Sequence, residues 1–208
     1  MILASLKPYY YYLIGEKKKN IEVRKSALKD LSQDIVFYMS KDEKSFAKIP
    51  KEFQEKYRKH FGKVGIRAVV DKICPMKMTI TAYGDLILLS KIGMICNYNI
   101  CLSNDELYAY LGGKMGYGWN LDSVAIYDKP KELSEFRISC NRKNLCYSCN
   151  RFTGKPWDIC NNSITRPPQS YMRVEELKEC KMCDLYDDIL DCPHGDCETC
   201  TYVQDLGE

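Results

Sequence analysis

The stretch ILASLKPYYYYLIGEKKKNIEVR, residues 2–24, predicts a strand, a short helix and a second strand in quick succession. Residues 2–6 are apolar and suit a strand. Pro8 suits the first turn of a helix, where its missing N–H would have no helical partner in any case. Gly15 suits the left-handed residue that commonly ends a helix. A loop with three lysines then leads into the second strand.

The second strand, residues 20–24, alternates polar and apolar side chains. Successive side chains of a strand point to opposite faces, so Glu22 and Arg24 are expected side by side, with Ile21 and Val23 in the core. The preceding lysines crowd the entrance to the polar face. We interpret this face as a functional site. A solvated strand with an incidental ion pair is the alternative, because charge runs usually lie on the surface.

These residues resemble the N-terminal signature of the ASCH family, which is similar to PUA domains that bind RNA or read modified nucleotides. The resemblance rests on SLKP, residues 5–8, followed after a helix by the pattern G…K-x-x-E-x-R, formed here by Gly15, Lys19, Glu22 and Arg24. It implies an α+β fold, a small PUA-like β-barrel with peripheral helices.

Four later segments resemble further strands of such a barrel. They are residues 34–40 (DIVFYMS), 63–73 (KVGIRAVVDKI), 116–122 (GYGWNLD) and 168–174 (PQSYMRV). The resemblance covers most of residues 1–136 and about 163–177. We therefore expect one ASCH-like domain over residues 1–177, interrupted by an insertion at about 137–162 and followed by a tail, residues 178–208.

Two helices are expected outside the barrel. Residues 50–61 place Phe53 and Tyr57 four positions apart among charges, which is typical of an amphipathic helix. A second helix is expected from Ser103, because SNDE forms a capping box. Residues 74–102 fit an extra hairpin or a loop.

The residues expected to bind nucleic acid are Lys7, Lys19, Glu22, Arg24, Ser40, Tyr117 and Trp119. Lysine and arginine would anchor phosphate, and Glu22 would accept a hydrogen bond from a base amino group. Glycines around Tyr117 and Trp119 leave room for close approach, so these rings are expected to stack on a base. Burial in the barrel core is the alternative for both rings.

The resemblance also implies possible enzymatic activities. Some ASCH relatives hydrolyse an acetylated cytidine nucleoside, using a lysine and a threonine nucleophile in a K-T-x-T-x-R run, and others are reported as ribonucleases. The aligned run here is KNIEVR, residues 19–24, with Glu22 at the nucleophile position. A carboxylate does not replace a hydroxyl in that acyl transfer. If the chain is an enzyme, its catalytic residues would be Lys19, Glu22 and Arg24, with Glu22 as general base.

Bulk composition narrows the class of protein. The chain has 208 residues with 45% hydrophobic content, which argues against disorder. No run of about 18 apolar residues occurs, so no transmembrane helix is expected, and the N-terminus does not fit a signal peptide. A cytoplasmic protein is therefore expected. Only two histidines, His60 and His194, are present, which disfavours Ser–His–Asp chemistry; His60 is expected on the surface.

Charge is unevenly distributed along the chain. The net charge is +3 overall, but residues 178–208 contain two Lys/Arg and nine Asp/Glu, a net −7. The remainder has 29 Lys/Arg and 19 Asp/Glu, a net +10. A basic body with an acidic appendage is typical of a domain that binds a polyanion.

Twelve cysteines are unusual for a cytoplasmic chain, where disulfides are rare. The expected insertion carries C-x5-C-x2-C-x10-C, formed by Cys140, Cys146, Cys149 and Cys160. The tail adds two C-x2-C pairs, Cys180, Cys183, Cys197 and Cys200, with Cys192 and His194 as alternate ligands. The spacing predicts one or two structural Zn²⁺ ions, bound by four thiolates each or shared between the segments. Free thiols, redox chemistry, disulfides or an iron–sulfur cluster are the alternatives.

Three classes of function remain. The first is a binding module for RNA, single-stranded nucleic acid or a modified nucleotide. The second is an ASCH-type ribonuclease or nucleoside amidohydrolase that uses the same residues. The third is a small zinc-stabilised interaction protein, of the kind that phages encode, which binds a protein partner through the insertion and the acidic tail.

Overall fold

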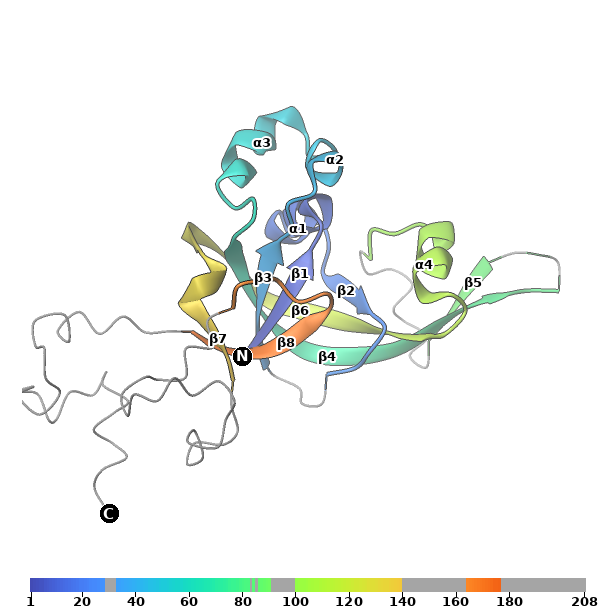
Figure 1. The fold of residues 1–208 in the computed structure, drawn as a ribbon. Helices are drawn as coiled ribbons and strands as arrows, with labels where there is room; N and C mark the ends of the chain where they lie inside the picture. The colour runs from blue at the N-terminus through green and yellow to red at the C-terminus, as the bar shows by residue number, and fades with distance from the viewer. Residues whose placement is uncertain (29–32, 83, 85, 91–99, 140–163, 177–208) are drawn as a thin grey trace, which may run out of the picture. The chain divides into compact units, whose positions relative to one another are not determined.

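The computed structural model describes residues 1–28, 33–82, 84, 86–90, 100–139 and 164–176 (Figure 1). The chain divides into two compact units, Met1–Glu175 and Glu176–Glu208. Most of the expected insertion and the whole tail lie outside the described residues.

One mixed sheet contains every described strand. The strands are β1 (Ile2–Leu6), β2 (Ile21–Arg24), β3 (Gln33–Met39), β4 (Val64–Ile80), β5 (Leu86–Ser90), β6 (Met115–Lys131), β7 (Phe136–Ile138) and β8 (Tyr171–Glu176). Their order is β2-β6-β4-β3-β1-β8-β7, and β5 pairs with β4. β1 runs parallel to β3, whereas β4 is antiparallel to β3, β5 and β6. Each of the four strand segments predicted after residue 24 overlaps one of these strands.

Four α-helices accompany the sheet in the described part of the chain. They are α1 (Pro8–Gly15), α2 (Glu43–Phe46), α3 (Lys51–Arg58) and α4 (Asn104–Leu111). Figure 1 shows α1, α2 and α3 grouped at one end of the sheet and α4 beside β5. The predicted capping box of α4 is confirmed: Ser103 accepts from the Glu106 N–H, and Glu106 accepts from the Ser103 N–H.

The far half of β4 accounts for the predicted hairpin. Met76 to Ile80 of β4 pair antiparallel with β5, and the same part of β4 pairs with the beginning of β6. This extension encloses a separate apolar cluster of Ile21, Val23, Cys74, Met76, Met78, Leu107 and Leu111. The main apolar core, which includes Trp119, lies on the other side of β2.

The two faces of β2 therefore differ as the alternation predicted. Ile21 and Val23 point into the separate cluster. Glu22 is paired directly with Trp119 on β6, and residues paired in this way share a face of the sheet. Both faces are nevertheless covered, because all four residues of β2 are buried. The alternative of a solvated strand face is therefore wrong.

Arg24 bridges β2 to strands at the other end of the sheet. Its two terminal nitrogens donate to the carbonyl oxygens of Ser5, on β1, and Ser170, next to β8, at 2.8 and 3.1 Å. Tyr171 donates to the carbonyl of Ala27 beyond β2. The described strands form an open hydrogen-bonded path, so the predicted barrel appears as a curled mixed sheet whose ends are joined by side chains.

The prediction that Gly15 ends α1 in a left-handed conformation is wrong. Gly15 is the last residue of the helix, and the left-handed residue is Lys17, with φ of 55°. Glycine is required at position 15 by contact with α3, since a Cβ there would lie 2.3 Å from Tyr57 Oη. Tyr57 is fixed there by donating to Glu16 Oε1 at 2.7 Å.

The expectation that His60 lies on the surface is also wrong. Its side chain is completely buried, with Nδ1 3.0 Å from the Tyr11 hydroxyl. Phe53 and Tyr57 form the predicted apolar side of α3, and His60 extends that side by one further turn. The spacing 53, 57, 60 is therefore the signal for burial, and the charged neighbours of His60 obscure it.

Candidate functional site

Three charged side chains meet on the polar face of β2. Lys19, Glu22 and Arg24 are only 2%, 8% and 5% exposed. Glu22 Oε2 lies 3.6 Å from Lys19 Nζ, and Glu22 Oε1 lies 3.1 Å from Arg24 Nε. We call these residues the charged cluster. The structure thus brings together the lysine, glutamate and arginine of the K-x-x-E-x-R pattern.

Arg24 is held by the protein rather than presented to a ligand. Its terminal nitrogens bind the two carbonyls described above, and its guanidinium lies 5.6 Å from the centre of the Trp119 ring. Only Nε faces Glu22, at ion-pair distance but without hydrogen-bond alignment. The predicted role of Arg24 as a phosphate anchor does not fit this arrangement, in which it positions Glu22.

Lys19 is covered by the chain that leads into α4. Its ammonium donates to the carbonyl of Ile100 and lies 5.6 Å from the centre of the Tyr10 ring. The thiol of Cys101 donates to the carbonyl of Lys18 at 3.3 Å. Burial lowers the pKa of Lys19, and the nearby Glu22 carboxylate opposes that shift.

Two tyrosines, one from each neighbouring helix, are affected by the charges of the cluster: Tyr10 lies beside Lys19, and Tyr110 lies beside Lys25. Burial raises the pKa of Tyr10 on α1, and Glu106 and Glu22 add to the shift. Burial also raises the pKa of Tyr110 on α4, where the charges of Arg24 and Glu22 act in opposite directions. Tyr10 belongs to the run of four tyrosines at residues 9–12. Tyr110 was missed, because only the fold brings α4 to β2.

Several buried polar atoms around Glu22 lack a hydrogen-bond partner among the described residues. They include Asn20 Oδ1, Arg24 Nε and Trp119 Nε1. Asn20 precedes Glu22 by two positions, and Trp119 lies directly across from Glu22 on β6. Unpaired buried polar atoms are rare and call for an explanation. This face has hydrogen-bonding capacity that the described part of the protein does not use.

The other predicted binding residues are placed differently. Trp119 is fully buried, with its ring edge-to-face against Tyr171 at 5.2 Å. It has no exposed face on which a base could stack, so that prediction is corrected to a core role. Tyr117 is half-buried opposite Arg24. Lys7 and Ser40 follow β1 and β3, and neither forms an ion pair or hydrogen bond with the charged cluster within the described residues.

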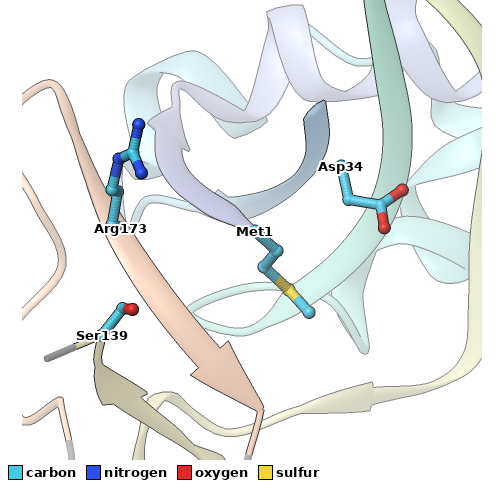
Figure 2. Close-up of a pocket in the computed structure, with 4 residues that line it drawn as sticks. All are labelled: Met1, Asp34, Ser139 and Arg173. Atoms are coloured by element: carbon cyan, nitrogen blue, oxygen red, sulfur yellow. The ribbon is translucent and has the colours of Figure 1, made fainter. Parts of the chain in front are cut away.

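A separate hollow lies at the beginning of β1. Figure 2 shows the four residues that line it, Met1, Asp34, Ser139 and Arg173. Its volume is about 240 Å³. The Asp34 carboxylate already accepts hydrogen bonds from two nitrogens of Arg67, at 2.7 and 3.2 Å. The hollow shares no residue with the charged cluster.

The predicted zinc ligands cannot be placed. Cys140, Cys146, Cys149, Cys160, Cys180, Cys183, Cys197 and Cys200, with Cys192 and His194, all lie outside the described residues. Among the residues that are described, no group of three or more His, Cys, Asp or Glu could hold a metal ion. In that same part of the chain, no helix is long and apolar enough to cross a membrane.

Comparison with known proteins finds similarity only among solved structures, since no family model and no curated protein matches the sequence. The fold is similar to the crystal structure of ASCH from Zymomonas mobilis, with 17% identity over 84% of this chain and 87% of that one and a TM-score of 0.43. Two point mutants of that protein give 16% identity and TM-scores of 0.47 and 0.44, over 84% of this chain and 87% and 89% of theirs.

These structural neighbours are ASCH proteins. ASCH is also the family that residues 5–24 resemble. At these identities and TM-scores, no residue role is carried over from the ASCH structures. The roles proposed below are argued from the contacts of this chain.

Proposed function

We propose that this ASCH-like chain binds a nucleotide base, within RNA or as a modified nucleotide, at the charged cluster. One observation carries the proposal: the Glu22 carboxylate is buried between two cations, on a face with unpartnered polar atoms. Each buried charge has a desolvation cost of several kcal/mol, which pairing repays only when the geometry is excellent. The 3.6 Å separation of Lys19 and Glu22 is not such a geometry, which favours a role in binding.

Glu22 and Lys19 together offer what the edge of a base requires. A carboxylate has about four acceptor positions, and the two cations near Glu22 leave some of them for amino or imino groups of a ligand. The Lys19 ammonium has three donors, and one binds Ile100. An acceptor beside a donor complements a base edge, where donors and acceptors alternate. Arg24 would contribute by holding Glu22 in place.

Replacing Glu22 with glutamine is expected to weaken base binding by at least about tenfold, because a hydrogen bond to a charged group contributes about 1.5–3 kcal/mol. Isothermal titration calorimetry with nucleosides, nucleotides and short RNA would measure the change. Glu43→Gln is the matched control, because Glu43 is an exposed carboxylate that pairs with Arg58 on α3. Equal affinities of the native protein and Glu22→Gln, both folded, would contradict the proposed site.

A hydrolase is the second candidate, and the environment of Lys19 favours it. Burial lowers the pKa of this amine, and buried lysines with lowered pKa values can act as general bases. RNA and acetylated cytidine are the substrates to test. An enzyme using this site would lose activity in both Lys19→Met and Glu22→Gln. Activity that survives both substitutions would place the chemistry elsewhere.

Zinc remains a proposal based on cysteine spacing. We propose one or two structural Zn²⁺ ions bound by thiolates from the insertion and the tail. Native mass spectrometry with and without a chelator would count the ions, and a metal-free protein of unchanged stability would refute the assignment. A protein partner that binds the insertion and the acidic tail remains the third candidate function.

A further inference from the structure

We propose that residues 100–102, which we call the strap, are a built-in cover of the charged cluster, in which the Ile100 carbonyl occupies the position of a carbonyl oxygen of the ligand. A base that carries such an oxygen would displace the strap to reach Lys19. This inference rests on the proposed function and adds the regulation of the site and the class of base: guanine, cytosine or uracil, which carry carbonyl oxygens, rather than adenine, which carries none.

The charged cluster is closed in the structure. Lys19 and Glu22 are 2% and 8% exposed, and a base cannot contact side chains this buried unless a covering segment moves. The ammonium of Lys19 already donates to the Ile100 carbonyl. The thiol of Cys101 donates to the carbonyl of Lys18 at 3.3 Å. The strap therefore engages the cation that a ligand would need.

The lysine side of this contact is fixed to other elements of the fold. The backbone N–H groups of Lys18 and Lys19 both donate to the carbonyl of Leu13 on α1, at 2.8 and 3.0 Å. Glu22 belongs to β2, whose four residues all pair with β6. None of these contacts involves the strap, so Lys19 and Glu22 keep their places when the strap moves.

The strap itself is held less firmly. Among the described residues, no backbone N–H of the strap donates to a backbone carbonyl. Ile100 and Leu102 are only partly buried against the separate apolar cluster. Cys101 is exposed and has a φ of 55°, a left-handed conformation that is uncommon for residues other than glycine. Release of the strap therefore loses few contacts and relieves this conformation.

The beginning of α4 allows the strap to move without unfolding the helix. Ser103 and Glu106 form the capping box, so the first turn of α4 is satisfied without a contribution from the strap. Leu107 and Leu111 keep the helix packed in the separate apolar cluster. The chain can therefore pivot just before Ser103.

Acetylation of Lys19 measures opening of the strap without a ligand. A covered amine reacts only while the strap is open, so its rate follows the population of the open form. Pulse treatment with N-hydroxysulfosuccinimide acetate, followed by tandem mass spectrometry, would compare Cys101→Val with Cys101→Asn. Both remove the thiol, but asparagine tolerates the left-handed conformation and valine does not. We expect Lys19 to react at least about threefold faster in Cys101→Val.

Two controls distinguish opening of the strap from other effects. Lys44 is exposed and should react at the same rate in every variant. Ile66→Val removes one methyl group from the main core on β4 and lowers overall stability without touching the strap. It should leave the rate of Lys19 unchanged, whereas general unfolding would raise that rate.

Binding tests whether the Ile100 carbonyl stands in for the ligand. A ligand that binds only the open form gains affinity by the factor by which the open population rises. Isothermal titration calorimetry with guanosine, cytidine, uridine and adenosine monophosphates should therefore show the same ratio between Cys101→Val and Cys101→Asn as acetylation does. Adenosine monophosphate should bind about tenfold more weakly than the tightest of the other three, because it offers Lys19 no carbonyl oxygen.

The outcomes separate the two proposals. If nucleotides bind but the two Cys101 variants give equal Lys19 rates, or equal affinities despite different rates, the inference about the strap is overturned and the site at Glu22 stands. Tightest binding of adenosine monophosphate would overturn the match between the Ile100 carbonyl and a base carbonyl. If Lys19 reacts faster in Cys101→Val but neither variant binds any nucleotide or short RNA, the proposed function fails, and the inference that rests on it fails with it.

Discussion

Replacing Arg24 with methionine is expected to lower the free energy of unfolding by about 3–5 kcal/mol, the range observed when one partner of a buried charge pair is removed. The substitution leaves Glu22 without its closest cation. It also leaves the carbonyls of Ser5 and Ser170 without the donor that joins β2 to β1 and β8. Three groups thus lose a partner at once.

Urea unfolding followed by circular dichroism would measure this loss. Arg67→Met is the matched control, because Arg67, like Arg24, pairs with a carboxylate, but its pair with Asp34 is exposed. We expect the control to cost less than about 1 kcal/mol. Adding Glu22→Gln to Arg24→Met should restore part of the stability, because the uncompensated charge is removed. Equal costs for Arg24→Met and Arg67→Met would show that burial gives Arg24 no special role.

Acidification from pH 6.5 to about 4 is expected to remove about 3 kcal/mol of stability through His60. Burial, with smaller effects from Lys59 and Lys56, lowers the pKa of His60 to about 4 from the 6.5 of an exposed histidine. The unfolded chain therefore binds a proton in this range before the native protein does. Stability falls as the pH falls through this window and changes no further, through this group, once His60 is protonated in both states.

The comparison with His60→Gln isolates this effect from the carboxylates that also titrate in acid. Glutamine carries no charge at any pH, so the two unfolding free energies should converge as the pH falls from 6.5 to 4. Urea unfolding at several pH values would show this. Parallel curves for the two proteins would mean that His60 titrates normally and is not confined between Tyr11 and Tyr57.

Sequence patterns correctly predicted those elements whose formation depends on residues that are neighbours in the sequence. The alternation of residues 20–24 predicted β2 and the separation of Glu22 from Ile21, because a strand's period is independent of its partners. The SNDE sequence predicted the start of α4, because a capping box satisfies its own backbone N–H groups. Both are confirmed by the structure.

Long-range contacts explain what could not be predicted. The carbonyl partners of Arg24 come from Ser5 and Ser170, which lie far from it in the sequence. No pattern around position 24 reveals them, and so Arg24 resembled a phosphate anchor. Gly15 is required because Tyr57 approaches it from another helix. Tyr110 lies next to Lys25, just after β2, only because the fold brings α4 to that strand.

The indole N–H of Trp119 offers the most direct test of the proposed site. This donor is buried opposite Glu22 and has no partner among the described residues. Proton–nitrogen NMR spectra during titration with a nucleotide or short RNA would follow it, with Trp157 as the second indole signal, assigned through Trp157→Phe. We expect the Trp119 signal to shift on binding, and not to shift in Glu22→Gln. A ligand that binds while the Trp119 signal stays unchanged would contradict a site at the charged cluster.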